Sequence, residues 1–554
     1  MPDIITNPSR RYRICRKAGA GAQTAGPDPL QAVEREIARL AQQFNVQDAD
    51  GADRPAAQIL DRLGNRIAGT HTLVIEATDA VRDRLAARFA GEVDILDDFL
   101  LHPQRADLVQ PFGFATLNFF PADSDDALEF RIRVTDQEGR SIAGAKVTLA
   151  GGFWIDEGIT NAQGRVKLTL FHETPATLSA LAIQPAQGFW SRLIRRPLLV
   201  TGAENAVTVQ PLGAGIGQPD FPASQLDGWG MEAMGIPGQD LPVLGTARVA
   251  VIDSGLDTAH PDIAAAGGFD HGDSDDPTAT FVQDGSGHGT HVAGTVAAID
   301  NRFGVLGAAG PGVELFAHRV FPDARVSKIE AALDWCIDND VDIVNLSLGS
   351  AASDDGFDRS IAMARQAGVL CIAAAGNSGG PVMYPAAYPS VIAVAALGRQ
   401  GTFPDDSMHA LQVGTAGAGA WFAAKFTCRG PEIDLCAPGV AVISTMPGGG
   451  YAAWDGTSMA CPHVAGLAAR LLQTRSDLRA LPRGPARAAA LAEALLALCA
   501  DVGLPAEVQG RGLPVLASVA APSDPDRPEA DTVPASEAEA LALVERALAV
   551  LGAR

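Results

Sequence analysis

Residues 455–466, D-G-T-S-M-A-C-P-H-V-A-G, contain the side chain with the best setting for nucleophilic chemistry. Ser458 stands among small residues, at the entrance to an Ala/Gly/Val run that can pack as a buried helix. At a helix N-terminus, unpaired N–H groups and the positive end of the dipole favour the negative charge that develops on an attacked carbonyl oxygen. Ser458 is therefore the candidate nucleophile. Taken alone, G-T-S is more often a helix cap, because hydroxyl side chains cap helices well.

A serine nucleophile needs a base, and the base needs a carboxylate that orients it. Residues 247–257, A-R-V-A-V-I-D-S-G-L-D, place Asp253 at the end of an apolar run of strand type, where chemistry collects in open α/β sheets. Residues 285–294, G-S-G-H-G-T-H-V-A-G, place His288 at the start of a small-residue helix. Separately, each has an ordinary reading as a cap, turn or loop residue. Together, and in this order, they predict a catalytic triad.

These three segments resemble the subtilisin-like serine proteases (subtilases), and the likeness extends over roughly residues 225–514. The resemblance implies that Asp253 orients the imidazole, that His288 is general base and acid, and that Ser458 attacks the peptide carbonyl. It implies a serine endopeptidase that acts on protein or peptide substrates through an acyl-enzyme intermediate. The alternative is a catalytically silent binding or scaffold protein on the same fold.

The resemblance also assigns residues to the substrate cleft. The stretch I-A-A-A-G-N-S, residues 372–378, ends near Asn377, which matches the family's side-chain oxyanion donor and would otherwise be a turn residue. Residues 347–349, S-L-G, match a segment that pairs with an extended peptide through main-chain hydrogen bonds. The expected substrate-binding residues are Ser347, Leu348, Gly349, Ala375, Gly376 and Met383.

Met383 would fill the first specificity pocket, where relatives often have glycine. No acidic residue is evident near it, so we expect a preference for small or medium apolar residues before the scissile bond. The chain departs from the family pattern in two places. Ala324 and Arg325 stand where a glycine-containing substrate edge is common, and residues 401–424 form a longer stretch than the family usually has.

Residues 299–305, I-D-N-R-F-G-V, resemble the family's calcium loop. Carbonyl, amide and carboxylate oxygens are the ligands that calcium prefers, and it takes 6 to 8 of them. A metal-free turn is the alternative. The expected ligands are side-chain oxygens of Gln225, Asp262 and Asn301 and main-chain carbonyls of Ile299, Phe303 and Val305.

The expected elements around these motifs are those of an α/β fold, because apolar runs of strand length alternate with helical periodicity. The pattern predicts a subtilisin-like parallel sheet covered by helices on both faces. The predicted strands include residues 249–252, 315–320, 343–346, 370–374 and 391–395, and the predicted helices include residues 327–339 and 357–367.

A chain of 554 residues should hold more than one domain, because single cores stop growing near ~250 to 300 residues. Residues 1–26, Gly/Ala-rich with clustered charge, are expected to be disordered. Residues 27–112 read as a small α+β unit whose position and element order resemble the family's propeptide, a folding aid and inhibitor. A dimerisation or docking module is the alternative.

Residues 113–212 change to a period of two and predict a β-sandwich of Ig-like or carboxypeptidase-regulatory-like type, with a spacer or binding role. The remaining predicted parts are a linker (213–222), the catalytic domain (223–520), an acidic linker (521–535) and a C-terminal helix (536–554). The helix would pack back on the protein or bind a partner.

Because the sandwich intervenes, the propeptide-like unit cannot lead directly into the catalytic domain. We therefore expect residues 99–111, F-L-L-H-P-Q-R-A-D-L-V-Q-P, to occupy the cleft as a substrate-like strand that inhibits the enzyme intramolecularly. Release would follow cleavage in this segment or in the linker at residues 213–222.

The formal net charge of −23 argues against nucleic acid or an anionic membrane as partner, and it suits bound calcium. Seven cysteines without regular spacing do not indicate a disulfide framework or a zinc site, and Cys461 is expected to be a small core residue. No apolar run follows the basic residues near the N-terminus, and no run of ~18 apolar residues occurs elsewhere. The expectation is a cytoplasmic protein without a membrane span, with non-standard export left open.

Overall fold

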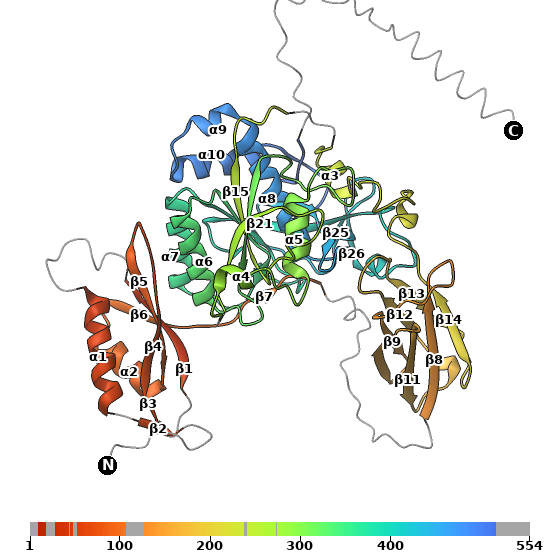
Figure 1. Cartoon of the computed structure of the whole chain (residues 1–554), viewed down its shortest axis with the longest axis horizontal. Helices are drawn as coiled ribbons and strands as arrows, with labels where there is room; N and C mark the ends of the chain where they lie inside the picture. Colours follow the sequence, from red (N-terminus) through yellow and green to blue (C-terminus); the bar gives the residue numbers. More distant parts are fainter. Residues whose placement is uncertain are drawn as a thin grey trace, which may run out of the picture. The chain divides into compact units, whose positions relative to one another are not determined.

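The computed structural model describes residues 9–17, 28–43, 45–47, 53–106, 127–237, 241–272 and 274–516 (Figure 1). The expected acidic linker at 521–535 and the expected helix at 536–554 lie outside these residues. So do residues 1–8 and 18–26 of the expected disordered N-terminus. No helix in the described ranges has the length and apolar character needed to cross a membrane.

A central sheet of nine strands organises the catalytic region. Its strands pair in parallel, except that β23 runs antiparallel to both β21 and β22. The inner strands are buried on both faces, which explains their continuous Val, Ile, Leu and Ala content. In sheet order the strands are β16 (Ala265–Asp270), β17 (Val313–Arg319), β15 (Ala247–Asp253), β18 (Ile343–Leu346), β20 (Leu370–Ala374), β21 (Val391–Arg399), β23 (Trp421–Ala424) and β22 (Val413–Ala416), with β24 (Leu435–Pro438) paired to β21.

Helices cover both faces of this sheet (Figure 1). Helices α5 (His288–Ala297) and α8 (Thr457–Thr474) pack together on one face, and α6 (Val326–Asp338) and α7 (Asp355–Gln366) cover the other. A Cβ atom on Gly466 would lie 2.8 Å from the carbonyl oxygen of Val296, so glycine permits the close approach of α8 to α5. The predicted α/β class is confirmed. Further helices of this region are α3 (Trp229–Ala233), α4 (Pro277–Thr280), α9 (Ser476–Ala480), α10 (Pro485–Leu496) and α11 (Ala506–Gln509).

The N-terminal unit is an antiparallel sheet with two helices packed on one face. Its core is formed by apolar side chains from both layers, including Tyr12, Ile14, Leu40, Leu73 and Leu85. The sheet order is β4 (Ala57–Asn65), β5 (Gly69–Ala77), β1 (Arg10–Arg16) and β6 (Val93–Asp97), and the helices are α1 (Pro29–Gln43) and α2 (Asp79–Arg88). A short ribbon, β2 (Asn45–Gln47) with β3 (Asp53–Pro55), accompanies them.

The expectation that residues 1–26 are disordered is wrong for β1, which lies between β5 and β6 inside this sheet. Tyr12 and Ile14 point into the core, while Arg13 points to the opposite face and is also fully buried. The expectation failed because the two carboxylates that pair with Arg13 lie 317 and 341 positions away in the sequence. Arg13 instead pairs with Glu330 on α6, at 2.6 Å, and with Asp354 at the start of α7.

Residues 127–209 form a β-sandwich of two sheets around a shared apolar core. Alternation explains the layers, since Phe130, Ile132 and Val134 are buried in one strand while the arginines between them face outward. One sheet has the order β10 (Ile155–Ile159), β9 (Lys146–Ala150), β12 (Ala180–Gln184), β13 (Arg192–Arg195), and the other β11 (Arg165–Phe171), β8 (Ala127–Thr135), β14 (Glu204–Thr208).

The sandwich docks on the long stretch at residues 401–424. The main-chain N–H of Leu193 donates to the carbonyl of Asp406 at 2.6 Å, and the Arg192 guanidinium pairs with the Asp406 carboxylate at 3.0 Å. Met408 is fully buried in a small apolar cluster with Leu193 and Ala182 of the sandwich. The added length therefore provides a docking surface for the sandwich.

Candidate active site

The structure pairs two of the predicted triad side chains, Asp253 and His288, and places Ser458 at the start of a helix that packs against the helix of His288. Asp253 is the last residue of β15, His288 the first of α5, and Ser458 the second of α8. The Nδ1 atom of His288 lies 2.7 Å from Oδ1 and 2.9 Å from Oδ2 of Asp253, and both side chains are buried. The opposite ring nitrogen, Nε2, is buried and has no hydrogen-bond partner among the described residues. This arrangement leaves Nε2 available to take a proton.

A network around Asp284 fixes the start of α5. Its carboxylate accepts hydrogen bonds from the hydroxyl of Ser254 at 2.8 Å, the main chain of Gly287 at 2.8 Å and the main chain of Thr290 at 2.8 Å. The Ser254 hydroxyl in turn accepts from the N–H of Gly289 at 2.8 Å. These bonds satisfy N–H groups at the helix start and hold the histidine beside β15.

Asn377 contacts Thr457, the residue before Ser458. The Asn377 amide oxygen accepts from the N–H of Thr457 at 2.9 Å and from its hydroxyl at 3.0 Å, so the amide NH₂ group points away from Thr457. That nitrogen is buried and unpaired among the described residues. The main-chain N–H of Ser458 donates to the carbonyl oxygen of Gln104 at 3.0 Å, and the Ser458 hydroxyl donates to the carbonyl of Ser347 at 2.9 Å.

The segment that ends the N-terminal unit runs through the cleft as a strand. The N–H of Leu101 donates to the carbonyl of Ala324 at 2.8 Å on one side. On the other side, β7 (His102–Pro103) pairs antiparallel with β19 (Leu348–Gly349), and the N–H of Gln104 donates to the carbonyl of Ser347 at 3.1 Å. Although Ala324 departs from the family pattern, its main-chain carbonyl still pairs with the strand in the cleft. Of the segment expected in the cleft, residues 99–106 are described and residues 107–111 are not.

The side chain of Gln104 lies between Gly349, one of the expected substrate-binding residues, and Asn377. Its amide oxygen accepts from the N–H of Asn377 at 3.2 Å, and its amide nitrogen donates to the carbonyl of Gly349 at 3.3 Å. A Cβ atom on Gly349 would lie 3.4 Å from that of Met383, so Met383 lies against the same segment. The chain's own segment thus places a polar side chain here, while the apolar preference expected for substrates stays a prediction. Ala375 and Gly376 lead into Asn377, and the N–H of Ala375 pairs with the central sheet.

The residue after Gln104 is held by an aromatic platform. The guanidinium carbon of Arg105 lies 3.6 Å from the ring centre of Trp454, and the N–H of Ala106 donates to the carbonyl of Asp455 at 2.9 Å. Trp454 stacks on His291, with ring centres 4.7 Å apart and an interplanar angle of 7°. Burial lowers the pKa of His291 to about 3, so this histidine stays neutral beneath the platform. Neither Trp454 nor the Gln104–Arg105 pair stands out in the sequence by itself.

Comparison with known proteins identifies a protein family for the region that contains these side chains. A profile of the Subtilase family matches residues 245–496. A Subtilisin of Bacillus pumilus is 41% identical over 233 residues, an alignment that covers 41% of this chain and 76% of that relative. The chain belongs to the subtilase family.

Two further relatives show how much of each protein the alignments cover. The M-protease of Shouchella clausii (strain KSM-K16) is 34% identical over 333 residues, which cover 57% of this chain and 75% of that protein. Subtilisin E of Bacillus subtilis (strain 168) is 41% identical over 233 residues, and this match spans 55% of its length. The chain therefore spans about half the length of several subtilisins that it matches.

The long stretch of this subtilase, residues 401–424, also contacts the D-G-T-S motif. His409 Nδ1 lies 2.7 Å from Oδ1 of Asp455, the first residue of D-G-T-S, and both side chains are buried. The N–H of Ala441 donates to the same carboxylate oxygen at 2.6 Å. On its other side, the His409 ring meets Trp190 of the sandwich edge to face, with ring centres 5.6 Å apart. These contacts connect the sandwich to the loop before Ser458, a link with no local sequence signal.

The six residues expected to bind calcium gather in one loop region. Gln225 Nε2 donates to the carbonyls of Ile299 at 2.8 Å and Val305 at 3.1 Å. Asn301 Nδ2 donates to Asp262 Oδ1 at 3.0 Å. The N–H of Phe303 donates to Asn301 Oδ1 at 2.9 Å, which holds the turn.

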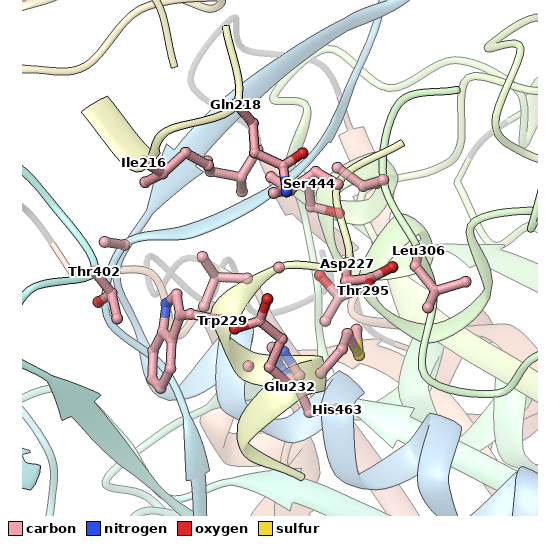
Figure 2. A pocket seen from close by; sticks show the side chains of 18 of the residues that line it. Ile216, Gln218, Asp227, Trp229, Glu232, Thr295, Leu306, Thr402, Ser444 and His463 are labelled. Atoms are coloured by element: carbon pink, nitrogen blue, oxygen red, sulfur yellow. The ribbon is translucent and has the colours of Figure 1, made fainter. Parts of the chain in front are cut away.

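A separate cavity of about 180 Å³ lies beneath helix α3 (Figure 2). Trp229 and Glu232 of α3 face it, as does His463 of α8. Burial, together with the charge of Asp300, raises the pKa of Asp227 in its wall, and burial lowers the pKa of His463 to about 4. Its described lining residues include none of the triad, so the reaction centre lies elsewhere. Cys461 is buried in the core, where burial raises the pKa of its thiol.

Proposed function

We propose that this chain is a serine endopeptidase that acts through Asp253, His288 and Ser458, and that its first substrate is its own Gln104–Arg105 bond. The observation that carries the proposal is the carbonyl oxygen of Gln104, which accepts from the N–H of Ser458 at 3.0 Å. A peptide carbonyl held there, in a strand paired on both sides, has the geometry of a substrate rather than of a structural strut.

In the proposed reaction His288 first accepts a proton from Ser458 and later donates it to the leaving amine. The Ser458 hydroxyl turns from the Ser347 carbonyl and attacks the carbonyl carbon of Gln104, while His288 Nε2 takes its proton. Asp253 keeps the imidazole in the tautomer with Nδ1–H and stabilises the imidazolium. The N–H of Ser458 and the amide of Asn377 stabilise the oxyanion.

Collapse of the tetrahedral intermediate breaks the C–N bond, and His288 gives its proton to the departing amine of Arg105. The acyl group of Gln104 then remains on Ser458 as an ester. A water molecule, deprotonated by His288, attacks this ester and releases the carboxylate of Gln104, which restores the Ser458 hydroxyl.

The experiment that tests the proposal is labelling of the processed protein with a fluorophosphonate, which reacts with activated serines. We expect one labelled tryptic peptide, with the probe on Ser458, and loss of hydrolysis in proportion to labelling. A scaffold protein on a silent fold would leave Ser458 unlabelled while the protein remains folded.

Replacing Asn377 by alanine should lower kcat roughly 10²- to 10³-fold, a range measured on the corresponding donor of a subtilisin. The lost amide acts on the oxyanion, so KM for a peptide substrate should change far less than kcat. The measurement is steady-state hydrolysis of an anilide substrate, with Ser378→Ala as the neighbouring control. An unchanged kcat for Asn377→Ala would remove this side chain from the oxyanion site.

The N-terminal unit is proposed to inhibit the enzyme intramolecularly. Its last described residues occupy the cleft, and its sheet contacts α6 and α7 through buried charge. Cleavage after Gln104 would leave it bound without a covalent link. Inhibition would then end when the cleaved unit dissociates.

Calcium is proposed to stabilise the loop at residues 299–305. An amide side chain presents either its NH₂ group or its oxygen, so Gln225 and Asn301 can bridge the nearby oxygens or bind a cation among them. The Asp262 carboxylate is already oriented, since its Oδ2 accepts from the N–H of Val305 at 2.9 Å and from the hydroxyl of Tyr451 at 2.8 Å. The donors present therefore fit calcium, which would supply charge neutralisation and loop rigidity.

Removing calcium with EGTA should lower the melting temperature of the protein. Free calcium at ~100 times its dissociation constant adds about 2.7 kcal/mol to the free energy of unfolding. Asn301→Ala is the matched variant, because it should melt at one temperature with or without calcium. Equal melting temperatures of the wild-type protein in calcium and in EGTA would contradict the site.

A further inference from the structure

A cavity of about 500 Å³ opens where the chain leaves the scissile bond on the amine side. Arg105 and Ala106 border it, so it receives residues that follow the cut. One wall belongs to the catalytic domain and consists of Ser286, Met446 and Trp454. Ser286 lies two residues before His288, and its hydroxyl accepts a hydrogen bond from the N–H of His288 at 3.2 Å. The cavity is thus a continuation of the reaction centre.

The other wall of this cavity is the end of one sandwich sheet. Lys146 begins β9 and Gln184 ends β12, and the two residues are paired in the register of these strands. Pro185 and Ala186 continue the wall. The chain then crosses to the catalytic domain, where the N–H of Gly188 donates to the carbonyl of Tyr451 at 2.7 Å.

This crossing fixes the wall relative to the reaction centre. Tyr451 lies in β26 (Gly450–Trp454), which pairs with β25 (Val442–Met446) along its whole length. The same hairpin therefore carries both Met446 and Trp454 of the first wall and holds the sandwich at Tyr451. Rigid elements of this kind position a binding surface better than free loops do.

We propose that the sandwich is part of the substrate-binding site: it receives the residues after the scissile bond, and Lys146 selects for an acidic side chain there. This inference rests on the proposed endopeptidase function. Lys146 pairs with Glu157 of the neighbouring strand at 2.9 Å, and both side chains are about half exposed. A substrate carboxylate can therefore compete for the ammonium group without burying an unpaired charge.

The wall persists after self-cleavage. A cut between Gln104 and Arg105 lies before the sandwich in the sequence, so the sandwich stays covalently attached to the catalytic domain. The first residue after the cut packs on Trp454, as Arg105 does, and the second lies at the mouth of the cavity, as Ala106 does. The third residue of a substrate is then the first that can reach Lys146.

The test compares three substrates of the processed full-length protein. Two are quenched peptides, L-L-H-P-Q-R-A-D-L, which copies residues 100–108, and L-L-H-P-Q-R-A-K-L. The third is the anilide of L-L-H-P-Q, which has no amino acid after the cut. Each peptide kcat/KM is divided by that of the anilide, which corrects for the amount of folded enzyme.

We expect the wild-type enzyme to favour the Asp peptide roughly two- to five-fold, as for a partly exposed ion pair. Lys146→Ala should remove this preference, and Lys146→Glu should reverse it. Lys167→Glu is the matched control, since Lys167 pairs with Glu129 on the other sheet and does not line the cavity. The same ratio in all variants, with the anilide still cut, would overturn the role of the sandwich alone. A wild-type protein that cuts no anilide would overturn the endopeptidase function and this inference with it.

Discussion

Replacing Ser458 or His288 by alanine is expected to leave the chain uncut at Gln104–Arg105, whereas the wild-type chain is expected to separate into residues 1–104 and 105–554. The two side chains act as a unit, so each single replacement should cost nearly as much as both together, about 10⁶-fold, the effect measured on a subtilisin. The measurement is intact mass of the purified proteins over time. The residual rate of each variant should be too slow to detect within days.

Cys461→Ala is the matched control for this experiment, because Cys461 lies on the same helix as Ser458 and is equally buried. It should still process, which separates chemistry from helix packing. The purified variants should stay uncut as long as no processed wild-type enzyme is present in the sample. Cleavage of purified Ser458→Ala at the same bond would assign the cut to a different protease.

Local pattern was sufficient for the central sheet. The apolar runs predicted at residues 249–252, 343–346 and 370–374 lie within β15, β18 and β20. The predicted helices at 327–339 and 357–367 overlap α6 and α7 with boundary shifts of one or two residues. Strands buried on both faces and helices with one apolar face carry their environment in their own composition, so neighbours in sequence decide these elements.

Non-local pairing explains what the sequence did not reveal. Arg13 and Glu330 are 317 positions apart, and neither shows from its own neighbours that it is buried. The same holds for His409 and Asp455, which meet across 46 positions, and for Trp190, which packs on His409. The segment at residues 99–106 was predicted to enter the cleft, but which bond faces Ser458 follows only from the strand register between Leu348–Gly349 and His102–Pro103.

Breaking the buried charge cluster around Arg13 is expected to release the cleaved N-terminal unit. Arg13 Nη1 lies 2.6 Å from Glu330 Oε1, and both side chains have no solvent exposure. Burial opposes the charge on Arg13, but the carboxylates of Glu330 and Asp354 raise its pKa, so the guanidinium stays charged. Arg13→Met keeps the apolar length of the side chain and leaves these carboxylates without their cation.

Removing one partner of a buried ion pair costs about 3 to 5 kcal/mol, because the other charge remains desolvated. The dissociation constant of residues 1–104 for the cleaved enzyme should then rise by roughly 10²- to 4 × 10³-fold. The measurement is anilide hydrolysis by the self-cleaved chain over a dilution series, in which the variant should become active at much higher protein concentration than the wild type. Intact chains are required, because a separate fragment 27–112 would lack β1, an inner strand of its sheet.

A charge-neutral partner change separates this mechanism from simple unfolding of the N-terminal unit. Adding Glu330→Gln to Arg13→Met removes the uncompensated carboxylate on α6, so inhibition should recover in part. Arg62→Met is the control for charge loss, because Arg62 pairs with Glu34 inside the N-terminal unit, with more than half of its side chain exposed. It should inhibit as the wild type does. If Arg13→Met and wild-type chains become active at the same dilution, the buried cluster contributes nothing to holding the unit in place.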